Sequence, residues 1–480
     1  MKKRLSFSFL FTAALLWGMT AGGQTASKSH IRLPGLFCNH MVVQQRSDLP
    51  VWGWGTPGER ITVTTSWDGK SRSTQADSLS RWSVTIRTPE AGGPHTITIS
   101  GRYDIELKNV MSGEVWLCCG QSNMEWAPMS LKEEGIPNRE AELSAADRYP
   151  QVRYLHVKRA DSDTPQEDFE GIWNVSNRAS SKWFTAVGQF FGRTLNEKLG
   201  VPVGLIGSYW GGTGAEVWTP APVVETDPEL AEAAARQHGD PRWYWPVRPG
   251  RAYNSMIHPL MRFPIAGAIW YQGESNAATY ATYEKLLQRM VASWREGWKS
   301  EFPFYIVQIS PYKDKEGMPG SNVLLREQQD RASRSIPRSG LVVVSDAGDS
   351  TTIHPTDKRP VGERLAWLAC ADHYGADSCR EWLCPRYESF SVRGNRMTLI
   401  FSRTGGELRT ASGEPSRYFE IAGKDMEFHP ARAELHGDRV VLSSPEVLHP
   451  TAARYGWGSL QYPDLVNRNG LPLGAFRTYR

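Results

Sequence analysis

Alternation of apolar and polar side chains dominates both ends of the chain. Between residues 30 and 105, short segments such as 61–64 and 81–86 alternate in this way, and Gly, Pro and Asp residues separate them. An alternation of period two is typical of strands with one buried face, and the close spacing of these segments predicts a small antiparallel β-sandwich. The same alternation returns after residue 385, for example at 397–401, and predicts a second β module.

The middle of the chain has a different pattern, in which unbroken apolar runs alternate with amphipathic segments. Segments 183–199 and 280–298 carry apolar residues at helical spacing, and Gly200 follows the first of them as a typical helix end. The unbroken runs indicate strands buried on both faces, and they lie at 115–119, 201–207, 265–270, 304–309 and 341–345. Strands that alternate with helices predict a mostly parallel α/β sheet.

These patterns predict a chain of three structural parts. An α/β domain with a three-layer core at 106–384 lies between a β-sandwich module at 30–105 and a C-terminal β module at 385–480. A chain of 480 residues is long enough for this number of domains and for a sizeable hydrophobic core.

The first residues have the pattern of a secretory signal peptide. Three basic residues at positions 2–4 precede an apolar run at 5–17 and small residues near 21–23. We therefore predict a signal peptide at 1–23 and export from the cytoplasm. The run is too short to span a bilayer, and no other stretch approaches the roughly 18 apolar residues that a span needs, so we predict no transmembrane helix.

Charge and cysteine content narrow the function further. Fifty-five Lys and Arg residues against 51 Asp and Glu residues give a net charge of +4, and three of the positive charges belong to the predicted signal peptide. The nearly neutral remainder lacks the basic surface of a nucleic-acid-binding protein, so we exclude that class. The cysteines do not have zinc-site spacing, and no metal site is predicted. Cys370, Cys379 and Cys384 are close enough in sequence for one local disulfide, but the pairing stays open.

A serine and a histidine follow two of the predicted strands, at the edge where parallel α/β sheets bind their ligands. Gly120 allows a tight turn after the strand at 115–119, so that the hydroxyl of Ser122 is exposed. This is not the GxSxG elbow of α/β-hydrolases, because position 124 is Met. His354 follows the last strand and precedes a helix, which makes it a candidate general base for Ser122.

Two further strands also end in polar or small residues. The Gly211–Gly212 pair follows the second strand, and backbone N–H groups there can approach a ligand oxygen. The third strand leads into a polar cluster with Gln272, Glu274 and Asn276. Each of these features alone has an ordinary structural explanation, such as a turn or a loop. Their occurrence together with Ser122 and His354 at successive strand ends favours nucleophilic catalysis.

Four of these blocks, in this order, resemble those of the sialate O-acetylesterase family, which belongs to the SGNH-type hydrolases. The blocks are 120–124, 210–213, 270–276, and 353–355 together with Lys358. Outside the motifs, residues 41–45 and 51–54 resemble the N-terminal β module of that family, and 325–329 resemble a helix of its core. The resemblance therefore covers most of the chain, and it implies an SGNH-hydrolase-like α/β core with flanking β modules.

The resemblance implies serine esterase chemistry without a metal or organic cofactor. Ser122 would attack an acetyl carbonyl with His354 as the base, and the resulting acyl-enzyme would be hydrolysed by water. The oxyanion would be held by the backbone N–H of Ser122, by Gly212 and by the side chain of Gln272. Candidate substrate-binding residues are Glu274, Asn276 and Arg326; Arg326, or alternatively Arg251, could pair with a sialate carboxylate.

One position departs from the family pattern and leaves the catalytic acid open. Many bacterial relatives carry Asp two residues before the histidine, where this chain has Thr352. Asp349 and Asp346 are nearby acids with a different spacing, and we take Asp349 as the candidate acid. Orientation of His354 by Glu274, or by a backbone carbonyl in a Ser–His dyad, remains open.

The expected function is that of an exported, periplasmic sialate O-acetylesterase acting on an O-acetylated sugar or glycan. A close alternative keeps the chemistry but acts on acetylated xylan or pectin. An alternative of another class is a non-catalytic sugar-binding protein, because the 19 Trp residues suit sugar rings, although Trp also fills β-sandwich cores. The loop at 220–250, with Trp243, Tyr244 and Trp245, is a candidate for sugar recognition. The sequence leaves the oligomeric state and the acetyl position open.

Overall fold

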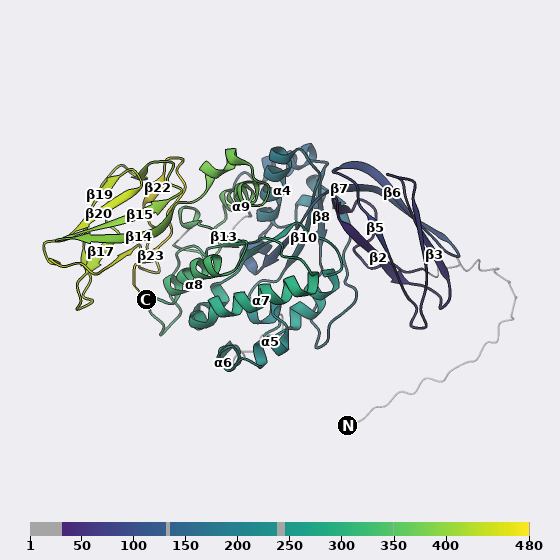
Figure 1. The fold of residues 1–480 in the computed structure, drawn as a ribbon, viewed down its shortest axis with the longest axis horizontal. Helices are drawn as coiled ribbons and strands as arrows, with labels where there is room; N and C mark the ends of the chain where they lie inside the picture. The colour runs from purple at the N-terminus through teal and green to yellow at the C-terminus, as the bar shows by residue number, and fades with distance from the viewer. Residues whose placement is uncertain (1–30, 131–134, 238–244, 349, 480) are drawn as a thin grey trace, which may run out of the picture.

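The central sheet of the molecule has the strand order β13-β12-β11-β7-β10-β8-β9 (Figure 1). Neighbouring strands run parallel, except for the antiparallel edge strand β9. Every residue of β10, β11 and β12 is buried, as their apolar composition predicts for strands covered on both faces. The strands are β7 (Asp104–Gly120), β8 (Val152–His156), β9 (Trp173–Val175), β10 (Val203–Tyr209), β11 (Gly267–Tyr271), β12 (Phe304–Val307) and β13 (Ser339–Val342).

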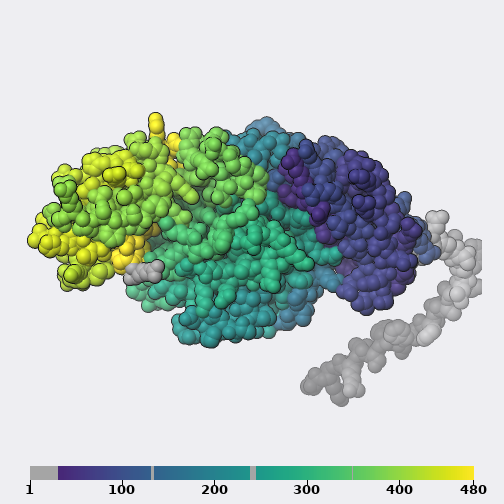
Figure 2. All heavy atoms as spheres, in the orientation of Figure 1, coloured from purple at the N-terminus to yellow at the C-terminus, as the bar shows by residue number. Residues whose placement is uncertain are grey.

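The structure is a computed structural model that describes residues 31–479 with gaps at 131–134, 238–244 and 349. A β module lies at each end of the α/β core (Figures 1 and 2). This arrangement confirms the predicted fold class, a mostly parallel α/β core with β modules on either side. The predicted signal peptide lies outside the described residues. None of the helices in the described ranges is long and apolar enough to cross a membrane.

Helices cover both faces of the central sheet. Alternate residues of β7 belong to two different clusters of the core: Trp116 and Cys118 lie in the cluster with helices α4 and α9, while Val115 and Leu117 lie in the cluster with α7. The period of two along the strand therefore sends one set of side chains to each helical layer. The helices are α1 (Ser122–Glu125), α2 (Arg139–Ala145), α3 (Arg178–Ser181), α4 (Ala186–Leu199), α5 (Ala221–Glu225), α6 (Pro228–Gln237), α7 (Tyr283–Trp298), α8 (Ser321–Ser335) and α9 (Arg359–Asp372).

Helix α4 shows how local sequence sets the ends of an element. Its first turn is capped by Thr185, whose Oγ1 accepts a hydrogen bond from the backbone N–H of Gly188 at 3.1 Å. Its last turn is closed by Gly200 in the left-handed region, as predicted. The predicted start at residue 183 is three residues early, and Trp183 lies ahead of the helix with 56% of its surface exposed.

The long strand β7 connects the N-terminal module to the core. Its first part pairs with β6 as far as Ser112, and its second part pairs with β10 from Glu114 onward. The predicted domain boundary at 105/106 falls within this strand, and the three-part division stays a prediction. The other strands of this module are β1 (Val42–Gln44), β2 (Asp48–Trp54), β3 (Arg60–Thr65), β4 (Ser71–Gln75), β5 (Arg81–Arg87) and β6 (Gly92–Ser100).

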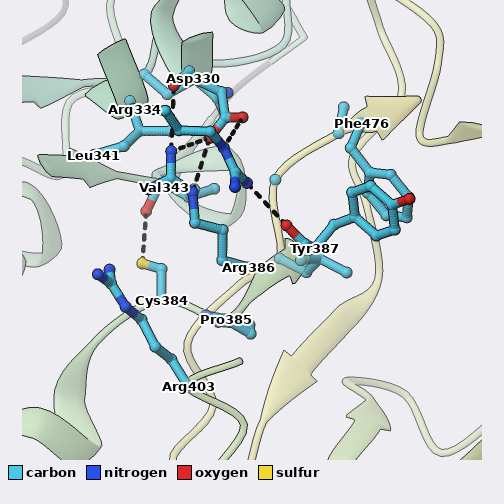
Figure 3. Close-up of a pocket in the computed structure, with 14 residues that line it drawn as sticks. Asp330, Arg334, Leu341, Val343, Cys384, Pro385, Arg386, Tyr387, Arg403 and Phe476 are labelled. Atoms are coloured by element: carbon cyan, nitrogen blue, oxygen red, sulfur yellow. Dashed lines mark hydrogen bonds and ion pairs between the residues drawn. The ribbon is translucent and has the colours of Figure 1, made fainter. Parts of the chain in front are cut away.

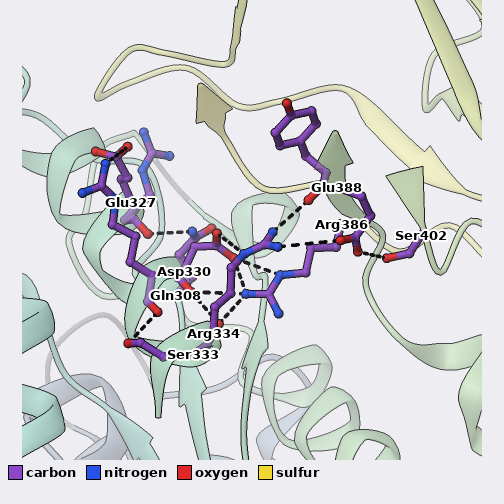
Figure 4. A network of polar contacts seen from close by, with 12 residues as sticks. Gln308, Glu327, Asp330, Ser333, Arg334, Arg386, Glu388 and Ser402 are labelled. Carbon is purple, nitrogen blue, oxygen red and sulfur yellow. Dashed lines mark hydrogen bonds and ion pairs between the residues drawn. The ribbon is translucent and has the colours of Figure 1, made fainter. Parts of the chain in front are cut away.

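The C-terminal module docks on helix α8 through a network of ion pairs (Figure 4). Asp330 on α8 accepts hydrogen bonds from Arg386 Nη2 at 2.6 Å and from Arg334 Nε at 2.9 Å. Arg334 in turn donates to the backbone oxygen of Tyr387 at 2.9 Å. The strands of this module are β14 (Arg386–Arg393), β15 (Arg396–Ser402), β16 (Leu408–Thr410), β17 (Phe419–Ala422), β18 (His429–Pro430), β19 (Arg432–His436), β20 (Arg439–Ser443), β21 (Ala452–Tyr455), β22 (Leu465–Asn467) and β23 (Phe476–Arg477).

A cavity of about 30 Å³ lies beside this junction (Figure 3). Val343 of the core and Cys384 and Arg403 of the C-terminal side contribute to its wall. The thiol of Cys384, one of six free thiols in the structure, faces the backbone oxygen of Val343 at 3.8 Å. This volume is about that of one water molecule, so the cavity is too small for a sugar.

Replacement of Asp330 by Asn tests the strength of this docking. We expect D330N to lower the free energy of unfolding by about 1–3 kcal/mol, because the substitution removes the charge that bonds two arginines. Urea unfolding measures this difference. Asp438, whose ion pair with Arg439 is exposed, supplies the control, since D438N should change stability by less than about 0.5 kcal/mol. Equal stabilities for D330N and D438N would show that the network contributes nothing to docking.

Candidate active site

The strands β7, β10 and β11 end together, and the turn after β7 depends on a glycine. Gly120 pairs with Tyr209 of β10 and with Tyr271 of β11. Its φ angle is 143°, and a Cβ at this position would lie 2.1 Å from the backbone oxygen of Tyr271. Only glycine fits this backbone and this close approach. The chain turns here, and Ser122 becomes the first residue of the short helix α1.

Ser122 lies opposite a histidine from the other end of the core. The Nε2 atom of His354 is 2.8 Å from the Oγ atom of Ser122. The imidazole stacks on the ring of Trp126, with centroids 5.3 Å apart and an interplanar angle of 24°. Thr352 accepts a hydrogen bond from the backbone N–H of His354 at 3.0 Å through its Oγ1 atom. The residue that departs from the family pattern thus shapes the backbone of the histidine loop.

A buried amide connects the serine turn to the histidine loop. The Nδ2 atom of Asn123 donates to the backbone oxygen of Ile353 at 3.1 Å and to the carboxyl group of Glu274. Its Oδ1 atom accepts from the ammonium of Lys358 at 2.6 Å. Burial raises the pKa of Glu274, while hydrogen bonds and the charges of Lys358 and Lys315 act in the opposite direction. Asn123 therefore holds three segments of the chain in one network.

A pair of glycines, Gly211 and Gly212, follows β10 near the serine, and Gly211 approaches it most closely. A Cβ on Gly211 would lie 3.3 Å from the Cβ of Ser122, so this loop approaches the serine closely. The backbone N–H of Gly211 donates to Glu125 Oε2 at 2.8 Å. The N–H of Gly212 forms no hydrogen bond within the described part of the chain. This N–H and that of Ser122, at the start of α1, are donors of the kind that stabilise an oxyanion.

A sequence model of the family described as carbohydrate esterase, sialic acid-specific acetylesterase, matches residues 112–370. This match covers more than half of the chain and includes all four motif blocks. The chain belongs to this family. It is therefore a carboxylic ester hydrolase, as the sequence motifs predict.

Known relatives of this esterase agree with the family match. The chain is 29% identical to the human sialate O-acetylesterase over 377 residues, which cover 70% of each protein. The mouse sialate O-acetylesterase is also 29% identical, over 396 residues, covering 70% of this chain and 72% of the mouse protein. The crystal structure of a carbohydrate acetylesterase from Xanthomonas citri is 34% identical and covers 94% of this esterase and 99% of its own chain, with a TM-score of 0.83.

Two predicted site residues of the esterase do not reach the cleft. Gln272 is fully buried, and its Nε2 atom donates to the backbone oxygen of Thr213 at 3.1 Å and to Oδ1 of Asn276 at 2.8 Å. The Nδ2 atom of Asn276 donates to Glu216 at 2.8 Å. Both amides thus use their hydrogens inside the protein. These contacts brace the strand-end loops from behind, and the oxyanion role of Gln272 and the substrate contact of Asn276 stay predictions.

The two arginines proposed for a sialate carboxylate are also engaged within the protein. Arg326 is 1% exposed, and its Nη2 atom donates to the backbone oxygen of Gly458 in the C-terminal module at 2.8 Å. Burial lowers the pKa of Arg326 to about 10. Arg251 forms ion pairs with Asp161 and Asp163. Arg326 thus connects the core to the C-terminal module, and its contact with a substrate stays a prediction.

The candidate acids near His354 have different surroundings. Asp346 forms a two-point ion pair with Arg364, at 2.7 and 2.5 Å, so its carboxylate is committed to that arginine. Asp349 lies outside the described residues, and its assignment as the catalytic acid stays a prediction. Glu274 borders the cleft and bonds Asn123.

The pair of Ser122 and His354 opens into a cleft of about 950 Å³. Ser122, His354, Gly212 and Glu274 all border it. This volume is in the range of small-molecule sites. Aromatic rings form much of its wall, namely Trp126, Trp183, Trp210 and Trp245. Trp245 belongs to the loop predicted for sugar recognition, whereas Trp243 and Tyr244 lie outside the described residues. The cleft also contains the charged residues Arg159 and Lys315, which the sequence did not single out. Across the described ranges, no group of three or more His, Cys, Asp or Glu side chains is arranged to hold a metal ion.

Proposed function

We propose that this esterase is an exported sialate O-acetylesterase, which removes O-acetyl groups from sialic acids through an acyl-enzyme. The observation that carries the proposal is the 2.8 Å contact between Ser122 Oγ and His354 Nε2 at the floor of a cleft. A hydroxyl within hydrogen-bond reach of an imidazole is the arrangement of an activated nucleophile. The names of the mammalian relatives support the sialate substrate.

In the first half of the reaction, Ser122 Oγ attacks the acetyl carbonyl carbon while His354 Nε2 takes the hydroxyl proton. The carbonyl oxygen becomes an oxyanion, and the N–H groups of Ser122 and Gly212 donate to it. His354 then gives its proton to the sugar oxygen, the C–O bond to the sugar breaks, and acetyl-Ser122 remains. Trp126 stacks on the imidazole and limits its rotation during both transfers.

In the second half, water replaces the sugar. His354 removes a proton from water as its oxygen attacks the acetyl carbon, and the same two N–H groups hold the second oxyanion. Collapse of this intermediate releases acetate and returns the proton to Ser122. Asp349 is the acid that we propose for orienting His354.

Export is the part of the proposal that rests on the sequence alone. The basic residues at 2–4, the apolar run and the small residues before position 24 predict cleavage near residue 23 and a periplasmic location. N-terminal sequencing of the protein recovered from the periplasm of its source cell gives the cleavage site directly.

Acetate release from two substrates tests the proposed function. We expect the wild type to release acetate from 9-O-acetylated sialic acid much faster than from acetylated xylan. A fluorophosphonate reagent should label the peptide that contains Ser122, and His354→Ala should slow this labelling, because the imidazole activates the hydroxyl. Acetate release from acetylated xylan alone would agree with the serine esterase mechanism but would overturn sialic acid as the proposed substrate. Sugar binding without any acetate release would favour the non-catalytic alternative.

A further inference from the structure

The charged groups of the cleft differ in whether a partner already neutralises them. Arg159 forms an ion pair with Glu125, which also accepts the backbone N–H of Gly211. Glu274 is buried and bonds Asn123. Lys315 is exposed, and its ammonium forms neither an ion pair nor a hydrogen bond with any described residue, although its charge helps to lower the pKa of Glu274. One cation of the cleft is thus available to an anionic ligand.

The backbone that carries Lys315 is fixed on both sides. The N–H of Lys315 donates to Ser321 Oγ at 3.1 Å, and its carbonyl oxygen accepts from the N–H of Met318 at 3.0 Å. The preceding residue, Asp314, accepts from Asn322 N–H at 3.0 Å and from the hydroxyl of Ser459 in the C-terminal module. This anchoring holds the base of the side chain in place beside the cleft, which reduces the entropy lost when the ammonium binds a ligand.

We propose that Lys315 binds the carboxylate of an anionic O-acetylated sugar and so makes the esterase selective for acidic over neutral substrates. The proposal deepens the proposed function and rests on it. An ammonium offers three donors on a flexible stem, which suits a carboxylate on a sugar whose acetyl group lies over Ser122. It also replaces Arg326 and Arg251 as the partner of that carboxylate.

The aromatic wall supports a sugar as the rest of this ligand. Trp183 lines the cleft with 56% of its surface exposed, and Trp210 and Trp245 line it as well. Indole faces bind the apolar C–H faces of sugar rings, while the charged group of the sugar needs a separate polar partner. A neutral acetylated sugar uses the aromatic wall alone, whereas an acidic sugar uses both the wall and Lys315.

A pair of substrates that differ only in charge tests this role. The probes are 9-O-acetylated N-acetylneuraminic acid and the methyl ester of its carboxyl group, with acetate release as the readout. We compare the kcat/KM for the acid with the kcat/KM for the ester as a ratio. We expect Lys315→Met to lower this ratio about tenfold, because a tenfold change corresponds to the loss of about one charge-assisted hydrogen bond. Lys315→Arg keeps the charge and should retain most of the ratio.

Lys313 provides the matched control, because its ammonium lies 5.7 Å from the ring centroid of Tyr312 and does not border the cleft. Lys313→Met should therefore leave the ratio unchanged. A wild type that hydrolyses acetylated sialic acid, with the same ratio in Lys315→Met, would overturn the role of Lys315 alone. A wild type that acts only on neutral acetylated sugars would overturn both this inference and the proposed substrate.

Discussion

Ser122→Ala is expected to lower kcat for acetate release by about 10⁵-fold or more, the scale seen when the nucleophile of a serine hydrolase is removed. The Oγ atom is the group that His354 Nε2 contacts at 2.8 Å, and alanine leaves the imidazole without a hydroxyl to activate. Substrate binding should change little, because the aromatic wall and Lys315 are untouched. The measurement is steady-state acetate release from 9-O-acetylated sialic acid, with substrate affinity of the variant followed by calorimetry.

A second serine of the same cleft makes the control specific. Ser130 also borders the cleft, but its Oγ accepts the backbone N–H of Ala127 and forms no hydrogen bond with any histidine of the described ranges. Ser130→Ala should keep kcat within about threefold of the wild type, since it removes one neutral hydrogen bond. If Ser122→Ala kept more than about 1% of the activity, the attacking group would have to be another one.

The fold class and the meeting of Ser122 with His354 could be predicted because both depend on local sequence. The buried strands are uninterrupted apolar runs. Gly120 stands where another backbone segment approaches too closely for a side chain, and Gly200 stands where the backbone is left-handed. Ser122 and His354 follow strand ends, and parallel strands bring those ends to one edge of the sheet. Topology alone therefore brings together two residues that are 232 positions apart.

The hydrogen-bond partners of Gln272, Asn276 and Arg326 could not be predicted, because residue type does not say which partner a buried polar group finds. Gln272 and Asn276 follow the same strand as Glu274, yet their hydrogens are used by Thr213 and Glu216. Arg326 bonds a backbone oxygen 132 residues away. Such partners depend on how loops pack in three dimensions, and no spacing along the chain reveals them.

Asn123 shows how much a motif residue beside the nucleophile contributes. The sequence placed it in the serine block, but gave no sign that its side chain reaches Glu274, Ile353 and Lys358. Lys358 is fully buried, so its ammonium depends on protein partners in place of water. The amide is thus a link between a buried cation, a buried carboxyl group and the loop that carries His354.

Asn123→Ala is expected to lower both stability and catalysis. Leaving a buried group without one of its hydrogen-bond partners costs about 1–3 kcal/mol of unfolding free energy, and we expect a loss at the upper end, because Asn123 bonds both Glu274 and Lys358. The loop at Ile353 loses its anchor, and a displacement of about 1 Å at His354 lowers kcat roughly 100-fold. KM should change far less, because Asn123 lies beneath the cleft.

Urea unfolding and steady-state kinetics on the same preparation separate these two effects. Asn174→Ala is the control, because Asn174 is exposed and its side chain bonds, among the described residues, only the nearby backbone oxygen of Ile172. The rate of fluorophosphonate labelling at Ser122 gives a third readout, which should fall with kcat because it reports on the Ser122–His354 contact. A variant that is less stable but keeps the labelling rate and kcat of the wild type would limit Asn123 to a structural role. Loss of kcat and of labelling in the fraction that remains folded would instead assign it to positioning the histidine loop.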